Sequence, residues 1–363
     1  METFSVLIPD GEAPHALPVV RCLGAVPGIT IHVGSARRDV KLRHSRHVSS
    51  FHLLPKRREA TWLDQLCDLA RATRVDLILP VHEPTVRLAV LWKERLREVC
   101  TLAPMPDLEN FDRAVDKGQL AHLMKHAGIP HPHTLDCNGE LEEALKQIGF
   151  SFPAIVKACR GSFGRQVYEV PSAEALFALL EKTAGDVHEY IAQPYIDGYD
   201  IDASVLCQEG RVLAWTMQRE RLAIPDSFEP PLVVEFFHDD PALSQVRRLM
   251  EQLRWTGVAH IDMRYDEADQ QIKVLEINAR FWGSLLGSLT AGINFPYLAC
   301  QIALGASPAI PISSPGLYFG RGITGRVRSE EALPYSWRRG NLPYILADPM
   351  PEVLSWWKGR AGN

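Results

Sequence analysis

The chain has 363 residues, 46% of them hydrophobic and 23% charged, with a formal net charge of −5 at pH 7; this composition is ordinary for a soluble protein of two or three domains and gives no reason to expect nucleic-acid binding. No apolar run is long enough to span a membrane, and the first residues lack the basic region of a signal peptide. Seven scattered cysteines without a CxxC pair favour free thiols, so we expect a cytoplasmic protein with no nucleic-acid or membrane partner.

The first part of the chain alternates between apolar runs and amphipathic segments. We expect strands at residues 4–8, 29–33, 48–53 and 75–80, and helices at residues 15–25, 61–73 and from 83 to about 99. Strands that alternate with helices indicate a parallel sheet with helical crossovers, as in nucleotide-binding domains. The first turn lacks the GxGxxG pattern, so we do not expect a dinucleotide site there.

Two polar pairs follow strands of this first unit. Asp10 and Gly11 come after the first strand, and His82 and Glu83 come after the fourth. The carboxyl ends of strands are where open α/β sheets bind ligands. The pattern leaves a second interpretation open, in which Glu83 only begins a helix near the positive end of its dipole.

A proline pair at residues 104 and 106 marks a linker, and the elements expected after it are less regular. Gly128 is placed to end a helix, and Ser172 to begin one. The expected helices are 107–127, 141–148, 173–182 and 242–253; the expected strands are 152–157, 167–170, 190–195, 200–206 and 211–217. Residues 219–231 are polar and proline-rich, which predicts a mobile surface loop, and residues 311–363 show no clear period.

Residues 255–283 are predicted to form a hairpin of two strands joined by a polar turn. Strand side chains alternate between faces, so Glu276 and Asn278 point the same way and Arg280 follows if the strand continues. Asp262 could face them from the first strand. Carboxylate and amide oxygens are ligands suited to Mg²⁺, and the arginine suits a carboxylate or phosphate. The alternative is that these acids are simply solvated.

Three further signals precede this hairpin in a fixed order. Lys117 lies within the helix expected at 107–127, and Lys157 ends a strand that leads into the glycine-bearing turn at 161–164. A lysine beside such a turn can direct ammonium and backbone N–H groups at phosphates. The extended segment 193–200 could offer backbone groups to adenine and an acid to ribose. Taken singly, each also fits an exposed lysine, a hairpin glycine or a turn acid.

In this order, the motifs resemble the ATP-grasp superfamily over roughly residues 105–305. The sequence EINARFWGS at residues 276–284 is most similar to the carbamoyl-phosphate-synthase-like branch, which includes amino-acid ligases. The resemblance implies an α/β chain that is α+β in its C-terminal part. The implied divisions are a Rossmann-like domain at 1–105, an N-terminal ATP-grasp subdomain with the glycine loop at 106–190, a C-terminal subdomain with the magnesium site at 191–310, and an extension at 311–363.

The resemblance also implies roles for individual residues. The phosphate-binding residues would be Lys117 and Lys157, beneath a glycine loop that contains Gly161, Ser162 and Gly164. The adenine-contacting linker would contain Gln193, Tyr195 and Ile196, and the ribose-binding acid would be Asp200. The magnesium ligands would be Asp262, Glu276 and Asn278, and the catalytic residues would be Lys157, Asn278 and Arg280. Gln193 and Asp200 replace glutamates that are more usual in the family.

The function implied by the resemblance is an ADP-forming ligase that uses ATP and Mg²⁺, with Mn²⁺ as an alternative metal. It would convert a small carboxylic acid, such as an amino acid, to an acyl phosphate and join it to an amine or a thiol. Its partners would be these small molecules, and a homodimer is left open. Three alternatives also stay open: a small-molecule kinase, a carboxylase-like enzyme of the same fold, and a non-catalytic ATP-binding regulator. The sequence does not identify the carboxylate or the acceptor.

Overall fold

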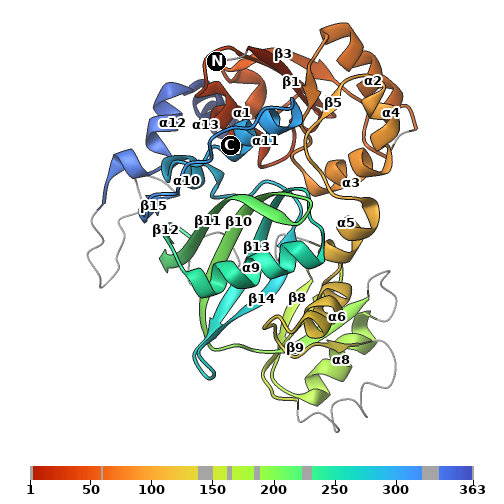
Figure 1. Cartoon of the computed structure of the whole chain (residues 1–363), viewed down its shortest axis with the longest axis vertical. Coiled ribbons are helices and arrows are strands. Elements are labelled where there is room, and N and C mark those ends of the chain that lie inside the picture. Colours follow the sequence, from red (N-terminus) through yellow and green to blue (C-terminus); the bar gives the residue numbers. More distant parts are fainter. Residues whose placement is uncertain are drawn as a thin grey trace.

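The computed structural model describes residues 3–58, 60–137, 150–161, 166–183, 189–222, 231–320 and 335–361. Its strands form one parallel sheet of five strands and two antiparallel sheets of four and six strands. Figure 1 shows the parallel sheet with its helices at one end of the molecule, the four-stranded sheet at the other, and the six-stranded sheet between them. The expected α/β class, with an α+β C-terminal part, is confirmed.

The N-terminal unit is the predicted parallel sheet. Its strand order is β3-β2-β1-β4-β5 and all its neighbouring pairs are parallel. The strands are β1 (Phe4–Ile8), β2 (Ile29–Ser35), β3 (Val48–Leu53), β4 (Leu77–Ile78) and β5 (Thr101–Leu102); the helices are α1 (Ala16–Gly24), α2 (Trp62–Thr73), α3 (Glu83–Leu91) and α4 (Lys93–Arg97). The prediction of a single helix up to residue 99 was wrong, because the helix is interrupted at Trp92, which lies between α3 and α4.

The helix expected at 107–127 is also two helices, α5 (Leu108–Val115) and α6 (Lys117–Ala127). Asp116 between them has an extended backbone, with φ −91° and ψ 110°, and its carboxylate accepts a hydrogen bond from the backbone N–H of Gln119. Aspartate is a favoured N-cap residue, because its side chain can accept a hydrogen bond from a free backbone N–H of the first helical turn. The break makes Lys117 the first residue of α6, where its side chain is buried.

The four-stranded sheet has the order β6-β9-β7-β8. Its strands are β6 (Leu135–Asp136), β7 (Ala154–Ala158), β8 (Val167–Val170) and β9 (Tyr190–Pro194), followed along the chain after β8 by α8 (Ala173–Thr183). The strands expected at 152–157 and 167–170 are confirmed as β7 and β8, which pair in antiparallel fashion. The Ser172 hydroxyl accepts a hydrogen bond from the Ala175 N–H, as expected of a helix cap. The helix expected at 141–148 lies outside the described residues.

The six-stranded sheet has the order β14-β13-β10-β11-β12-β15, with every neighbouring pair antiparallel. Its strands are β10 (Gly198–Gln208), β11 (Arg211–Leu222), β12 (Val233–Phe237), β13 (Gly257–Asp266), β14 (Gln271–Asn278) and β15 (Gly316–Phe319). The predicted hairpin is therefore confirmed as β13 and β14. Residues 219–222 of the loop expected at 219–231 belong to β11, so that part of the prediction was wrong, and residues 223–230 lie outside the described part.

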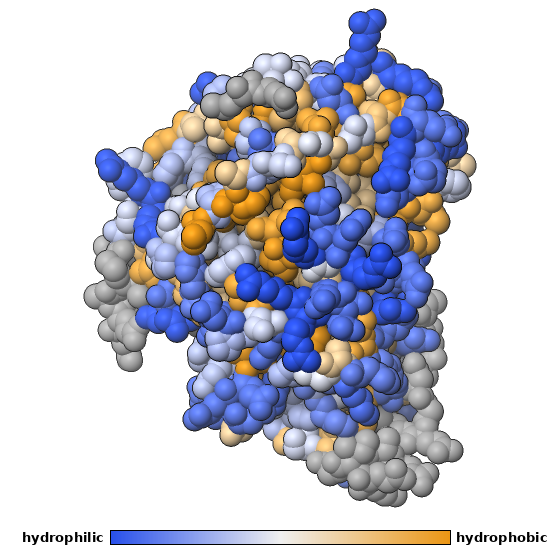
Figure 2. Space-filling view, in the orientation of Figure 1, coloured by the Kyte–Doolittle hydropathy of each residue, from blue (hydrophilic) through white to orange (hydrophobic). Residues whose placement is uncertain are grey.

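Helix α9 (Asp240–Gln252) covers one face of this sheet (Figure 1). Its apolar side chains share one core with residues of the sheet and with α2, α3, α5 and α6. Helices α10 (Leu285–Thr290) and α11 (Phe295–Ala303) share a second core with α1 and the parallel sheet. On the face shown in Figure 2, hydrophobic residues gather over the N-terminal unit and its junction with the larger sheet. The two units are therefore joined by continuous apolar packing.

The C-terminal segment returns to both units, although its sequence shows no clear period. Strand β15 adds to the edge of the larger sheet beside β12, and α12 (Leu342–Ala347) and α13 (Met350–Ala361) follow. The buried Asp348 carboxylate accepts hydrogen bonds from the Arg21 guanidinium, the Ser45 hydroxyl and the Arg46 N–H. The division of the chain at residues 105, 190 and 310 stays a prediction. None of the described helices is both long and apolar enough to cross a membrane.

Candidate active site

Two rows of polar side chains cross one face of the six-stranded sheet. Reading from β11 through β10 and β13 to β14, the first row is Gln218, Asp202, Asp262 and Glu276, and the second is Thr216, Ser204, His260 and Asn278. Members of the two rows are two residues apart on each strand, so all of them face the same side. The intervening row is apolar and buried against α9 on the other face: Met217, Ala203, Ile261 and Ile277. The alternation of these four strands thus separates a polar face from the core.

The predicted metal ligands meet in these rows. Asp262 lies directly opposite Glu276 on the neighbouring strand. The Asn278 amide Nδ2 donates a hydrogen bond to Asp262 Oδ2 at 3.1 Å. Asp262 Oδ1 is buried and has no hydrogen-bond partner among the described residues. An unsatisfied carboxylate oxygen between a second carboxylate and an amide is a donor set that fits Mg²⁺ or Mn²⁺.

The pKa values of Asp262 and Glu276 are shifted in opposite directions by their surroundings. Burial, with the nearby Glu276 and Asp202 carboxyl groups, raises the pKa of Asp262 well above its usual range. Burial also acts to raise the pKa of Glu276, but the ammonium groups of Lys117 and Lys157 outweigh it and the net shift is downward. When both of these adjacent carboxyl groups are ionised, their negative charges repel each other. A divalent cation bound between them would offset this repulsion.

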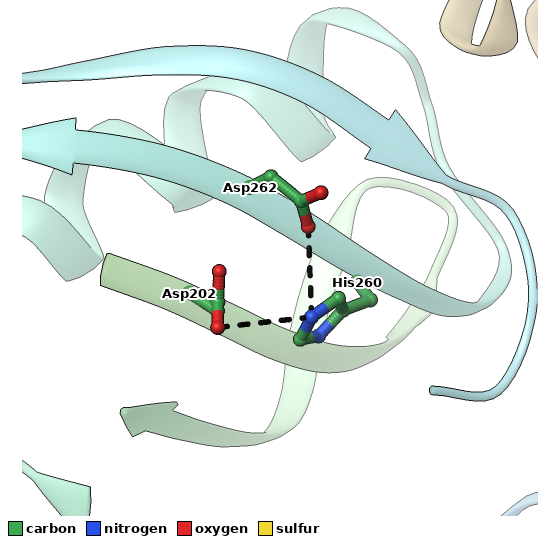
Figure 3. A group of neighbouring side chains, drawn as sticks. All are labelled: Asp202, His260 and Asp262. Atoms are coloured by element: carbon green, nitrogen blue, oxygen red, sulfur yellow. Dashed lines mark ion pairs between the residues drawn. The ribbon is translucent and has the colours of Figure 1, made fainter. Parts of the chain in front are cut away.

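Sequence reasoning missed two residues beside these ligands, His260 and Asp202. Figure 3 shows Asp202 on β10 and His260 and Asp262 on β13, with their side chains directed at one another. The His260 Nε2 atom lies 3.5 Å from Asp262 Oδ1 and 4.0 Å from Asp202 Oδ2. The signal for His260 was its position two residues before Asp262, because both then face the same side of a strand.

His260 is held in one orientation from two directions. Its Nδ1 atom shares a hydrogen bond of 2.9 Å with the Ser204 hydroxyl. Its ring stacks on Trp282, with ring centroids 5.5 Å apart and an angle of 9° between the planes. Burial and the nearby Arg280 lower the pKa of His260 to about 3, so the imidazole is neutral at pH 7. The site therefore contains a fixed, uncharged imidazole beside the carboxylates.

The two predicted phosphate-binding lysines come from the smaller sheet and its flanking helix and approach the same carboxylate. Lys117 Nζ lies 3.1 Å from Glu276 Oε2 and donates a hydrogen bond to the Gly161 carbonyl oxygen at 3.2 Å. Lys157, on β7, is buried, and burial is the main reason that its pKa falls to about 8. Gly161 is the only member of the predicted glycine loop that the structure describes, because Ser162 and Gly164 lie outside the described residues.

The linker between the two antiparallel sheets carries the residues predicted to contact adenine. Gln193 is buried, and its amide Nε2 donates a hydrogen bond to the Thr134 hydroxyl at 2.8 Å. Ile196 is also buried, whereas the Tyr195 ring is exposed. Gly198, just beyond, has φ +151°, and a Cβ there would overlap the carbonyl oxygen of Tyr265, so the turn requires glycine.

Arg264 holds this linker, and sequence reasoning did not identify it. Its guanidinium donates hydrogen bonds of 2.8 Å to the carbonyl oxygens of Ile196 and Gly198. It also pairs with Asp200, the residue predicted to bind ribose, which lies opposite it on β10. The guanidinium carbon lies 5.6 Å from the centre of the Tyr195 ring. One arginine thus fixes the backbone of the predicted adenine contact and the predicted ribose contact.

Arg280 lies at the end of β14, beyond Glu276 and Asn278. Its guanidinium is buried and donates hydrogen bonds to Asn278 Oδ1 at 2.8 Å and to the Phe281 carbonyl oxygen at 2.9 Å. The planar guanidinium can bind a carboxylate or phosphate through two parallel hydrogen bonds. Its position next to the predicted metal ligands supports the predicted role of binding a carboxylate or phosphate.

Two family models match overlapping parts of the chain. Residues 186–317 match the family described as ATP-grasp in the biosynthetic pathway with Ter operon, and residues 114–221 match the RimK-like ATP-grasp domain. The matches together run from the helix that carries Lys117 to strand β15, through all the residues described above. The chain is a member of the ATP-grasp superfamily. The resemblance expected from the motifs is therefore confirmed.

Among curated proteins, this ATP-grasp protein is similar to the D-aspartate ligase of Enterococcus faecium, with 24% identity over 60% of the chain and 56% of the relative. It is also similar to a carbamoyl-phosphate synthase of Methanobrevibacter smithii, with 21% identity over 64% of the chain and 65% of the relative. The matched region thus spans between about half and two thirds of the length of these two curated relatives.

Solved structures of ATP-grasp proteins share the fold. The biotin carboxylase domain of the Hydrogenobacter thermophilus 2-oxoglutarate carboxylase, solved with MgADP and bicarbonate, has a TM-score of 0.68 and 17% identity, covering 87% of this chain and 74% of that one. The N5-carboxyaminoimidazole synthetase of Staphylococcus aureus, solved with ADP, has a TM-score of 0.68 and 16% identity, covering 88% and 83%. The L-amino acid ligase of Bacillus licheniformis has a TM-score of 0.60 and 19% identity, covering 84% and 74%.

Proposed function

We propose that this ATP-grasp protein is an ATP- and Mg²⁺-dependent ligase. It activates a small carboxylic acid as an acyl phosphate, joins it to an amine or a thiol, and releases ADP and phosphate. The observation that carries the proposal is the convergence of Lys117, Glu276 and Arg280, three residues with distinct roles in such a reaction, around one polar face. The similarity to a D-aspartate ligase and the fold shared with an L-amino acid ligase support the same reaction class.

ATP would lie between the four-stranded and six-stranded sheets. The linker with Gln193, Tyr195 and Ile196 would border adenine, and Asp200 would bind ribose. Lys117 and Lys157 would bind the phosphates, since both are buried lysines that interact with Glu276. The loop with Gly161, Ser162 and Gly164 would close over them, a role that stays a prediction from the sequence.

Asp262, Glu276 and Asn278 would hold the metal, and the unsatisfied oxygen of Asp262 is the structural observation that fits this role. Bound there, Mg²⁺ would supply charge neutralisation to the phosphate oxygens of ATP during transfer. Mn²⁺, which accepts the same oxygen ligands, is the alternative metal. Lys117 and Glu276 would then exchange their mutual contact for contacts with the nucleotide and the cation.

The chemistry follows from charge placement. A carboxylate oxygen of the substrate attacks the γ-phosphorus of ATP, and the bond between that phosphorus and the β,γ-bridging oxygen breaks to release ADP. Arg280 binds the carboxylate before this step and the acyl phosphate after it, and Lys157 balances the charge that develops in transfer. The amine or thiol then attacks the acyl carbon, and phosphate leaves with the bonding electrons. The protein contributes positioning and fixed charges.

The test is ADP release measured against a panel of amino acids and other small carboxylic acids, with and without hydroxylamine. A ligase that forms an acyl phosphate will release ADP and give a hydroxamate in the same amounts. A small-molecule kinase will release ADP without a hydroxamate, a carboxylase-like enzyme will require bicarbonate, and an ATP-binding regulator will bind ATP without turnover. Any of these three results in place of hydroxamate formation would overturn the proposal.

A further inference from the structure

Asp202, His260 and Asp262 form a compact group to which the proposed reaction gives only one role, that of Asp262. Among the described residues, it is the one group of three or more histidine, cysteine or acidic side chains close enough to hold a metal ion, with one ligand atom of each within 4.8 Å of the others. Asp202 lies directly opposite Asp262 on the neighbouring strand, and the side chains are directed at one another (Figure 3). Strand pairing thus brings one imidazole and two carboxylates together on the polar face.

The distances within this group fit ligands of one cation better than hydrogen bonds. His260 Nε2 lies 3.5 Å from Asp262 Oδ1 and 4.0 Å from Asp202 Oδ2. Both separations exceed the usual length of a hydrogen bond. Two ligands bound to zinc in tetrahedral geometry, each at about 2.1 Å, lie about 3.4 Å apart. The Asp202 carboxylate would therefore have to approach the imidazole by only roughly half an ångström.

Hydrogen bonds from neutral side chains hold the imidazole and Asp202 in place. The Ser204 hydroxyl lies 2.9 Å from His260 Nδ1, and the Gln218 amide Nε2 donates a hydrogen bond to Asp202 Oδ2 at 2.8 Å. The tautomer in which Nδ1 donates to the hydroxyl leaves the lone pair of Nε2 facing the carboxylates. Histidines and carboxylates that bind metals are oriented by partners of this kind, so the group has the support that a metal site needs.

The two carboxylates form no ion pair with a lysine or arginine of the described part of the chain; their nearest ion-pairing group is the imidazole of His260, which is neutral at pH 7. Burial raises the pKa of Asp202 to about 7, as expected of a carboxylate whose charge is poorly compensated. The buried Asp262 Oδ1 atom has no hydrogen-bond partner among the described residues. A divalent cation would satisfy this oxygen and offset both charges.

We propose that Asp202, His260 and Asp262 bind a divalent first-row transition-metal ion, at a site beside the predicted Mg²⁺ site and joined to it through the Asp262 carboxylate. A carboxylate has about four lone-pair positions, so it can bind two cations. Imidazole suits transition metals, whereas Mg²⁺ prefers oxygen ligands, so the affinity should fall from Co²⁺ to Mn²⁺ and be weakest for Mg²⁺. Three protein ligands leave at least one position for water or a substrate atom. The proposal does not depend on the ligase function, which requires only Mg²⁺ or Mn²⁺ at the first site.

The test is equilibrium dialysis of the full chain against Co²⁺ in excess Mg²⁺, without ATP. We expect one tightly bound Co²⁺ per chain in the wild type and in Glu276→Gln, which alters only the predicted Mg²⁺ site. Asp202→Asn keeps an oxygen for the Gln218 hydrogen bond but loses the charge, and His260→Gln loses the nitrogen ligand; each should weaken Co²⁺ binding about 100-fold. Ser204→Ala removes only the partner of Nδ1 and should weaken it about tenfold.

The matched control is His122→Gln, which makes the same change to a histidine that is 65% exposed on α6 and should leave Co²⁺ binding unchanged. Melting curves check that each variant is folded. Binding that is lost in Glu276→Gln but kept in Asp202→Asn would place Co²⁺ only at the predicted Mg²⁺ site and overturn the proposal. Binding that every variant retains would overturn it too.

A second measurement needs no variant. Pulsed EPR of Mn²⁺ bound to the wild type detects a directly coordinated imidazole nitrogen, and we expect this signal from His260. A wild type that binds no Co²⁺, or one whose bound Mn²⁺ shows no nitrogen ligand, would overturn the proposal even if the variants do not fold. Each of these outcomes leaves the ligase function intact, because that function is tested separately by hydroxamate formation with Mg²⁺.

Discussion

Lys117 and Glu276 form an ion pair of 3.1 Å between α6 and β14. Lys117 begins a helix that flanks the four-stranded sheet, and Glu276 lies on the edge strand of the six-stranded sheet. The pair therefore connects the part of the chain that would bind phosphates with the part that would bind the metal. The phosphates of ATP can replace Glu276 as the partner of Lys117, and Mg²⁺ can replace Lys117 as the partner of Glu276. The binding of ATP and the binding of Mg²⁺ should therefore depend on each other.

We predict that Glu276→Gln removes metal binding and ATP turnover while the fold persists. The change removes one of the two facing carboxylates, and loss of a metal ligand should cost on the order of several kcal/mol of transition-state stabilisation. Mg²⁺ alone, at about 100 times its dissociation constant, should stabilise the wild type by about 2.7 kcal/mol and Glu276→Gln much less, as measured by thermal unfolding. The control is Asp269→Asn in the turn of the same hairpin. Near-normal turnover of Glu276→Gln at saturating Mg²⁺ would contradict the metal assignment.

We predict that the affinity for ATP falls as the pH rises through about 8. Burial lowers the pKa of Lys157 to about 8, so the free protein loses this ammonium charge above that pH, and ATP binding must then take up a proton. The apparent affinity should fall toward a limit of about tenfold per pH unit, measured by calorimetry from pH 7 to 9.5. Lys157→Arg should bind ATP more weakly at pH 7 but with no such pH dependence, because arginine stays charged. A flat wild-type profile would remove Lys157 from the phosphate site.

The sequence was sufficient to predict that the candidate metal ligands of one hairpin lie together. Glu276, Asn278 and Arg280 are two residues apart, and strand alternation alone puts the first two on one face; the polar turn of the hairpin then allows Asp262 to lie opposite them. Asp202 lies on β10, far from the hairpin in the sequence, and its register against β13 is set by the packing of the whole sheet. A hydrophobic pattern within one strand contains no information about such a register.

The errors in the fold have similar causes. The apolar periodicity of residues 107–127 continues across Asp116. The pattern therefore gives no sign of the break between α5 and α6, which occurs where the Asp116 side chain caps α6. Strand β5 has two residues and β15 has four, too few for alternation to be visible. Their pairing is decided by neighbouring strands, β4 and β12, that contribute the other half of the hydrogen bonds.

We predict that Arg280→Lys leaves ATP affinity within about twofold and strongly lowers hydroxamate formation. Lysine retains the charge but cannot make two parallel hydrogen bonds, and the loss should be on the order of 2–4 kcal/mol, similar to the loss of a preorganised oxyanion donor. The alternative is that Arg280 only supports the fold through Asn278 and the Phe281 carbonyl group. In that case the variant would melt at a lower temperature and show an unchanged rate per folded molecule, so kinetics beside a melting curve distinguish the two.

We predict that Asp348→Ala destabilises the protein by about 3–5 kcal/mol, because it leaves the buried Arg21 guanidinium without its buried partner. Arg21 is 6% exposed and Asp348 is 1% exposed, so water cannot replace the lost contact. The control is Glu352→Ala, which removes a second partner of Arg21 that is 31% exposed and should cost less than about 1 kcal/mol. Denaturant unfolding measures both; equal effects of the two changes would contradict the prediction.

The pair of Arg21 and Asp348 joins residues 327 positions apart, and this separation has a consequence for how the chain folds. Contacts between such distant residues are slow to form, because a long loop must close before they contribute stability. During synthesis, α1 emerges long before Asp348 does, so the Arg21 guanidinium must stay hydrated and α1 cannot complete its packing. Strand β12 likewise presents an open edge until β15 has been made, and open edges invite pairing with other chains. The nascent protein should therefore depend on protection from aggregation until α12 and α13 have left the ribosome.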